Sequence, residues 1–247
     1  MYSLVIMSIL IFLPLPIMVS TARKTSNGYK AIFDGVLAVG VALMMLFIIA
    51  AATGNSIGKY MLMGLQSFCE AAAETEQIVS MLGLQEVSMP ERVSVLTKVY
   101  SYAINSLPAI IIMCSTILCY FEYRFLARAI QKSKYPLPML EPFSDFTMPR
   151  MAIWGWVFIY LMSMLVSWLG FSAGEVLQIN IQLLFQFVFQ IQGAAVLFYF
   201  CKMKKFNKVV PIILCLIIVA SAIGQMLLCL LGFLDLGFSL RNRMKKS

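Results

Sequence analysis

The sequence contains no histidine. This absence excludes the Ser–His and Cys–His pairs of many hydrolytic enzymes, His-ligated haem and most catalytic zinc sites. None of the six cysteines forms a C-x-x-C pair, and four lie in apolar runs, so we expect buried thiols rather than metal ligands or disulfides. No P-loop, dinucleotide-binding glycine motif or nucleophile elbow occurs. The sequence therefore predicts neither an enzyme nor a bound cofactor.

Charged residues are scarce as well. They make up 12% of the chain, whereas hydrophobic residues make up 61%. Soluble globular proteins are only about 45–50% apolar, so a lipid bilayer must solvate much of this surface. A net charge of +8 is compatible with nucleic-acid binding, but the basic residues lie in short clusters between apolar runs, as in cytoplasmic membrane loops. We therefore predict a multi-pass membrane protein whose main partner is the lipid bilayer, with no nucleic-acid partner.

Six apolar runs are long enough to place a helix in the membrane. They cover residues 2–20, 31–53, 100–120, 151–169, 176–200 and 209–240. We expect one integral membrane domain over residues 1–247. The predicted fold is all-α, a polytopic transmembrane helical bundle with about six membrane segments and an amphipathic helical insertion between the second and third.

The insertion covers residues 54–99, which are less apolar than their neighbours. From Met61 to Leu82, apolar residues recur at steps of three, four or their sum, while Glu70 and Glu74 occupy another face. This pattern is typical of a helix that lies on the membrane or on other helices. Residues 88–91 have capping-box spacing with a proline near the start, which predicts that another helix begins there.

The last apolar run is too long for one span and too short for two with a loop. Basic residues cluster after the first, third and fifth runs, so we expect those loops to lie in the cytoplasm. If the last run were one simple span, the basic residues that follow it would then lie outside the cell. A broken or re-entrant hairpin that turns near residues 220–225 would return the tail to the cytoplasm. A single tilted span followed by an interfacial turn is the alternative.

Several segments suggest a family. They are "FLPLPIMV" at residues 12–19, "PFSDFTMPR" at 142–150, "IQGAAVLFYFCKMKKFNKVVP" at 191–211 and "LLGFLDLGFSLRNR" at 230–243. They resemble the YybS-like family of uncharacterised bacterial integral membrane proteins, whose helical layout is distantly similar to the substrate-binding subunits of energy-coupling-factor transporters. The resemblance implies a bacterial cell membrane and, by analogy, small-molecule binding. Family members are usually longer at the N-terminus, which implies a short variant or a fragment here.

The fifth apolar run carries a row of amides: Gln178, Gln182, Gln186 and Gln190. Their spacing of four residues places them along one face of a helix. Primary amides are costly to expose to lipid, so the row either lines a cavity that binds a substrate or joins helices by hydrogen bonds. Gln192 lies off this row.

Two acidic residues lie in or beside apolar runs. Asp235 stands near the chain end between two glycines that we expect to let the helix end. We predict that it lies at the membrane interface and pairs with Arg241 or Arg243, as a structural rather than a proton-coupling group. For Asp34, we expect a helix cap or a local ion pair with Lys30.

The favoured function is a small-molecule binding or transport component that uses the glutamine row. Because the chain has no nucleotide-binding motif, an active transporter would need a separate ATPase or another membrane partner. The alternative is a membrane scaffold that binds a protein through the insertion and the loop of residues 142–150, without transport activity.

Overall fold

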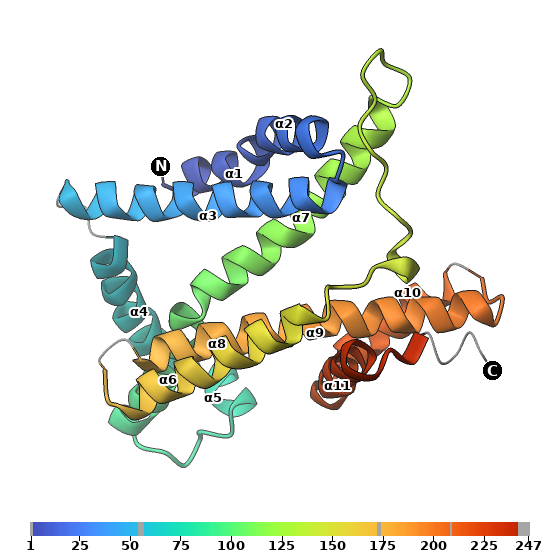
Figure 1. Cartoon of the computed structure of the whole chain (residues 1–247). Helices are drawn as coiled ribbons and strands as arrows, with labels where there is room; N and C mark the ends of the chain where they lie inside the picture. Colours follow the sequence, from blue (N-terminus) through green and yellow to red (C-terminus); the bar gives the residue numbers. More distant parts are fainter. Residues whose placement is uncertain (1, 54–56, 172–173, 208, 242–247) are drawn as a thin grey trace. The chain divides into compact units, whose positions relative to one another are not determined.

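The computed structural model describes residues 2–53, 57–171, 174–207 and 209–241 (Figure 1). These residues form α-helices, one short 3-10 helix and loops, with no strand among them. The chain divides into two compact units, Met1–Pro138 and Met139–Ser247, which we call unit 1 and unit 2. The all-α fold is confirmed, whereas a single membrane domain formed by both units stays a prediction.

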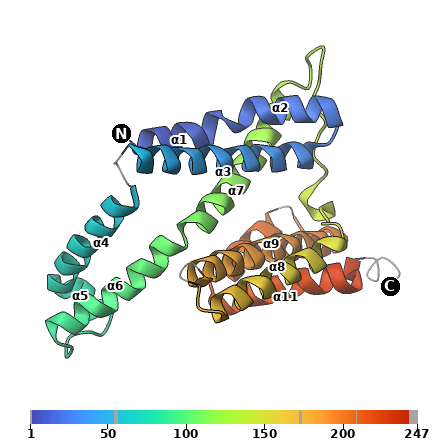
Figure 2. The same cartoon turned by 60° about the vertical axis from the view of Figure 1, so that its left-hand side comes forward.

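Unit 1 begins with two membrane-length segments. The helices are α1 (Tyr2–Phe12), α2 (Pro14–Thr25) and α3 (Gly28–Ala52). The first candidate span, Leu4–Thr25, covers most of α1 and all of α2, and Pro14 begins the second helix. The second candidate span is Gly28–Ala50. Helix α2 lies along α3 in both views (Figures 1 and 2).

The predicted insertion is helical where the structure describes it. It contains α4 (Ile57–Glu74), α5 (Glu76–Met81) and most of α6 (Met89–Asn105), and none of the three is a candidate span. Its apolar face packs internally through Leu65, Cys69, Ala72, Ala73 and Leu96. That the insertion does not cross the membrane stays a prediction.

Helix α6 begins where the capping-box spacing predicts. Ser88 is the residue before the helix, and Pro90 lies in its first turn. The Ser88 hydroxyl makes a 2.9 Å hydrogen bond with the Glu91 carboxylate instead of accepting from the backbone. The start is thus correct, although the hydrogen bonds are not those of a capping box.

The third membrane segment lies further along the chain than predicted. Helix α6 ends at Asn105, and α7 (Leu107–Ala129) forms the span, in place of residues 100–120. The error arose because Glu122 and Arg124 resembled the start of a loop, whereas the helix continues through them. This extension places Glu122 inside a candidate span.

Unit 2 is a bundle in which α9 is central. Its elements are the 3-10 helix η1 (Phe143–Asp145), α8 (Met151–Trp168), α9 (Gly174–Met203), α10 (Val210–Val219) and α11 (Ala222–Phe238). Helix α9 packs most extensively against α11 and also contacts α8, α10 and η1. Both α8 and α9 are candidate spans, so the described residues contain five such helices, or six if α10 and α11 are counted as one bent span.

The final apolar run is broken, which favours the hairpin over a single tilted span. The axes of α10 and α11 are bent by 117°. The Ser221 hydroxyl accepts a 3.0 Å hydrogen bond from the Gly224 N–H and thereby caps α11. A Cβ at Gly224 would lie 2.0 Å from the Ile218 carbonyl oxygen, so the tight turn requires glycine. The break falls within residues 220–225, as predicted.

Arg241, the last described residue, lies at the end of unit 2 where α9 terminates. Arg241 contacts the carbonyl of Ser144, and the adjacent Asp145 forms an ion pair with Lys202 in the last turn of α9. A single straight span from residue 209 would have carried Arg241 to the opposite end. The segment therefore leaves and returns on one side of unit 2, as the hairpin hypothesis requires.

Candidate functional site

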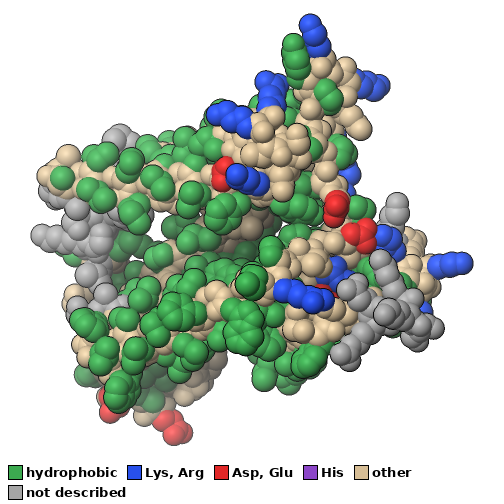
Figure 3. Space-filling view, in the orientation of Figure 1, with side chains coloured by type: hydrophobic (Ala, Val, Ile, Leu, Met, Phe, Trp, Pro, Cys, Tyr) green, Lys and Arg blue, Asp and Glu red, His purple; other side chains and the backbone are tan. Residues whose placement is uncertain are grey.

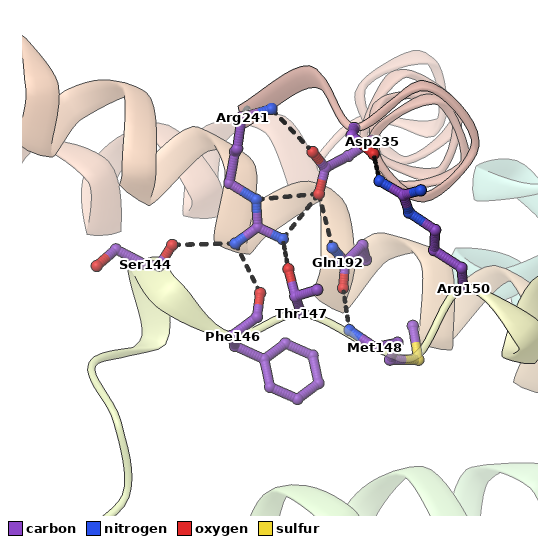
Figure 4. A network of polar contacts seen from close by, with 9 residues as sticks. Ser144, Phe146, Thr147, Met148, Arg150, Gln192, Asp235 and Arg241 are labelled. Carbon is purple, nitrogen blue, oxygen red and sulfur yellow. Dashed lines mark hydrogen bonds and ion pairs between the residues drawn. The ribbon is translucent and has the colours of Figure 1, made fainter. Parts of the chain in front are cut away.

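A buried ion pair joins the last turns of α11 to Arg241 in unit 2 (Figure 4). The Arg241 Nη2 and Nε atoms donate to Asp235 Oδ2 at 2.7 and 3.0 Å, and the Arg241 backbone N–H donates to Asp235 Oδ1 at 3.2 Å. Arg241 and Asp235 are only 8% and 5% exposed. The predicted pairing with Arg241 is therefore present, while Arg243 lies outside the described residues.

The second partner of Asp235 comes from α9. Gln192 is fully buried, and its Nε2 donates to Asp235 Oδ2 at 2.7 Å. Its Oε1 accepts from the Met148 backbone N–H at 3.2 Å. A single amide thus joins the end of α11 to the loop before α8.

The guanidinium of Arg241 is bonded to the same loop. Its Nη1 donates to the carbonyls of Ser144 and Phe146 at 3.2 and 2.8 Å, and its Nη2 donates to the Thr147 hydroxyl. Figure 4 shows these groups converging on the guanidinium. Asp235, Arg241 and Gln192, with residues 144–148, are called the buried polar network below.

Two glycines let α9 and α11 approach closely beside this network. A Cβ on Gly193 would lie 2.0 Å from the Leu228 carbonyl oxygen, and one on Gly232 would lie 2.0 Å from the Phe189 carbonyl oxygen. Such contacts are too short for any side chain, so the crossing depends on both glycines. The close approach lets an amide on α9 reach a carboxylate on α11.

The expectation that the glycines around Asp235 end the helix is wrong. Helix α11 continues through Gly232 and Gly237 to Phe238. Ser239 ends it in the left-handed conformation, at φ 53°, and its N–H donates to the Asp235 carbonyl at 2.8 Å. Gly232 is required for packing, whereas a Cβ on Gly237 would meet no other described part of the chain within 4 Å.

The charged groups of the network are hydrogen-bonded. Both carboxylate oxygens accept hydrogen bonds, and every terminal nitrogen of Arg241 donates at least one. A buried charge pair whose members are both hydrogen-bonded in this way fixes one arrangement of the chain. This geometry favours the structural role predicted for Asp235.

Two weaker contacts hold the same loop. Lys202 Nζ lies 2.9 Å from Asp145 Oδ2, with side chains that are 56% and 35% exposed. Arg150 donates to the Ser239 hydroxyl. The loop that precedes α8 is therefore tied both to α9 and to Ser239, directly after α11.

The structure places the glutamine row away from this network. Gln182 is exposed, whereas Gln178, Gln186 and Gln190 are half-buried. No hydrogen bond joins any of the four amides to another described residue. The row therefore has no hydrogen-bond partner in the described part of unit 2, and its binding role stays a prediction.

The acidic residues of unit 1 have different partners from those expected. Asp34 Oδ2 accepts a 2.9 Å hydrogen bond from the Thr21 hydroxyl, so its described partner is not Lys30. Instead, the Lys30 backbone N–H donates to the Asn27 side chain at 3.0 Å. The Oε2 atom of Glu122 is buried and has no hydrogen-bond partner in the described structure.

No group of three or more metal-ligating side chains occurs among the described residues.

Comparison with known proteins identifies the family. The family described as "Predicted membrane protein (DUF2232)" matches residues 2–236. The chain belongs to this family. A similar relative is "Uncharacterized protein YybS" of Bacillus subtilis (strain 168), 26% identical over 141 residues. The aligned region covers 56% of this chain and 44% of that relative. No solved structure matches.

These matches confirm the predicted YybS-like resemblance and the multi-pass membrane location. The chain spans less than half the length of this relative. This similarity therefore does not establish that the two proteins share an activity. The comparisons assign no transport or binding role.

Sequence reasoning missed Gln192, because it lies off the glutamine row and its partner Asp235 is 43 residues away. A signal was present in the segment at residues 191–211 that carries the family resemblance, which includes Gln192 and Gly193. Glu122 was also missed, because the third span was placed too early.

Proposed function

We propose that the protein binds or carries a small polar solute across or within the membrane. The observation that carries this proposal is the glutamine row of α9. Its four amides lie in a candidate span and have no hydrogen-bond partner among the described residues of unit 2. An unsatisfied amide in an apolar environment costs about 1–3 kcal/mol by mutational measures, so the row requires water, a solute or further protein beside it.

The broken segment next to α9 supports the same proposal. Helices α10 and α11 meet at a 117° bend, and both pack against α9. Discontinuous helices at membrane depth are tolerated where protein or water shields the backbone, and they commonly form the solute sites of secondary transporters. A solute with several hydrogen-bonding groups suits a row of amides, since each amide both donates and accepts.

The source of energy would lie outside this chain. The sequence contains no nucleotide-binding motif. A separate ATPase, as in the transporters whose layout the family resembles, is the partner proposed for active transport. Co-purification of an ATPase subunit with the tagged protein from native membranes would support it.

Cysteine accessibility tests whether the row meets water. In a cysteine-free background, Gln182→Cys and Gln186→Cys should react with a membrane-impermeant methanethiosulfonate reagent. Phe158→Cys is the control, because Phe158 is 62% exposed on the apolar candidate span α8. We expect the control to be protected from this reagent by lipid.

Two outcomes would contradict the proposal. If neither row cysteine reacts and spin labels there are reached by oxygen, the row faces lipid. If neither the methanethiosulfonate reagent nor oxygen reaches positions 182 and 186, the amides serve helix packing. Native mass spectrometry then tests binding: a solute that co-purifies with the wild type should be lost from Gln182→Leu/Gln186→Leu.

The scaffold alternative retains one supporting observation. Met81 and Leu82 are 86% and 51% exposed at the end of α5, where they form an apolar surface on the insertion. The loop of residues 142–150, the other proposed surface, is occupied by the buried polar network. A membrane protein that co-purifies with the wild type but not with Met81→Ser/Leu82→Ser would favour the scaffold.

A further inference from the structure

Unit 1 contains an open groove of about 580 Å³ between α2 and α7. Its apolar wall is formed by Leu15, Pro16 and Val19 of α2 and by Leu126 of α7. Its polar lining comes from Ser20, Arg23 and Lys24, near the end of α2. The groove is therefore apolar along its length and cationic at one end.

Both cations are available to an outside ligand. Arg23 and Lys24 are exposed, and neither forms an ion pair with a described residue. The nearby carboxylate of Asp34 is bonded to Thr21. Glu122 lies one helical turn before Leu126, and its buried Oε2 has no hydrogen-bond partner among the described residues. This oxygen therefore makes no hydrogen bond with Arg23 or Lys24.

The cations stand where a membrane span ends. They lie in the last turn of α2, and the candidate span Leu4–Thr25 ends beside them. On the face drawn in Figure 3, Lys and Arg side chains lie over the ends of α2 and α7, while apolar side chains cover the length of α3. Lipid phosphates occupy this depth in a bilayer, next to the edge of the hydrocarbon core.

The dimensions of the groove distinguish a lipid from a small anion. From Leu15 to Arg23 the helix rises by about 12 Å, at 1.5 Å per residue. A free phosphate would contact only the cationic end and leave the apolar wall exposed. An acyl chain would cover that wall while its headgroup met Arg23 and Lys24.

We infer that the α2–α7 groove is a specific binding site for an anionic phospholipid, with the headgroup phosphate at Arg23 and Lys24 and one acyl chain along Leu15, Val19 and Leu126. This site is independent of the solute proposed for the glutamine row. It differs from general attraction of lipids to basic loops, because a groove rather than an exposed loop supplies the contacts.

Native mass spectrometry of the detergent-purified protein, titrated with phosphatidylglycerol or phosphatidylcholine, tests this site. The wild type should bind one phosphatidylglycerol more tightly than phosphatidylcholine. Arg23→Gln/Lys24→Gln should weaken phosphatidylglycerol binding by roughly 25-fold, because one cation near the membrane surface contributes about fivefold. The matched control is Lys132→Gln/Lys134→Gln, which removes the same charge from exposed positions that do not line the groove.

Val19→Trp tests the apolar wall without a change of charge. It should reduce phosphatidylglycerol binding while circular dichroism and elution volume remain those of the wild type. If Val19→Trp fails to fold, the two charge variants still decide the question. If both charge variants lost phosphatidylglycerol binding equally, the attraction would be nonspecific and the site would be refuted. If soluble glycerol 3-phosphate competed fully with phosphatidylglycerol, the groove would bind a water-soluble anion instead of a lipid.

Discussion

The two halves of α9 carry the same side chain in opposite states. In the C-terminal half, Gln192 is fully buried and bonded at both ends, to Asp235 and to the Met148 N–H. The glutamine row, three of whose four members lie in the N-terminal half, is half-buried or exposed and has no partner among the described residues of unit 2. The difference lies in what packs beside each half, because α11 and the loop before α8 supply partners only to Gln192.

This contrast separates structure from binding. A fully buried amide that is bonded at both ends is closed to a ligand, whereas an unsatisfied one must find water, a solute or protein. Stability measurements should therefore respond strongly to the buried polar network and weakly to the row. Binding measurements should respond in the reverse order.

The largest expected effect comes from breaking the buried ion pair. Arg241→Gln leaves Asp235 as an uncompensated buried charge, and such changes destabilise by about 3–5 kcal/mol. The free energy of unfolding in mixed micelles, from titration with SDS, should fall by that amount. Asp235→Asn should also destabilise, because Arg241 would then be the unpaired charge.

Exchanging the two charges sharpens this test. Asp235→Arg/Arg241→Asp would again place opposite charges at these two positions. The new carboxylate at position 241, however, would face the carbonyls of Ser144 and Phe146. We therefore expect no recovery of the lost free energy. Full recovery would contradict the loop contacts and show that only the pairing of charges matters.

The glycine crossing is the next test. Gly232→Ala would place a Cβ 2.0 Å from the Phe189 carbonyl oxygen and force α9 and α11 apart, at a cost of about 3 kcal/mol. Gly237→Ala, five residues later in the same helix, would meet no other described part of the chain within 4 Å and should change stability by less than about 1 kcal/mol, in the favourable direction. Equal effects at both positions in the same SDS titration would refute the close crossing.

Gln192→Leu and Gln186→Leu compare the two halves of α9 directly. Loss of Gln192 removes a donor from Asp235 and the acceptor of the Met148 N–H, which should cost about 2 kcal/mol. Gln186→Leu breaks no described hydrogen bond and should leave the unfolding free energy within about 0.5 kcal/mol. A large loss at Gln186 would indicate a protein partner for the row rather than a solute.

Much of the fold follows from apolar run lengths alone. The all-α class and the break in the last run are physical consequences of a fixed bilayer thickness and a 1.5 Å helical rise. The third span was placed too early because charge was taken as the end of a helix. Arg124 remains helical and donates to the Tyr120 hydroxyl at 2.8 Å, so a charged residue near the end of a span need not end its helix.

The site was only partly predictable. Asp235 and Arg241 are six residues apart, so their pairing could be inferred locally. Gln192 and the carbonyls of Ser144 and Phe146 are separated from these charges by 43 to 97 residues, and only the packing of α9 on α11 brings them together. Periodicity places side chains on a face of one helix, but it carries no information about which other helix covers that face.

The smallest expected effect concerns the second ion pair of the same loop. Lys202 and Asp145 are 56% and 35% exposed, so Lys202→Gln should lower the unfolding free energy by at most about 1 kcal/mol. That loss should disappear in 1 M NaCl, where the screening length is about 3 Å, whereas the loss in Arg241→Gln should persist because its pair is buried. Unfolding of both variants at low and high salt measures this difference. If Lys202→Gln were as destabilising as Arg241→Gln and equally insensitive to salt, the exposed pair would hold the loop, and the buried polar network would lose its assigned role.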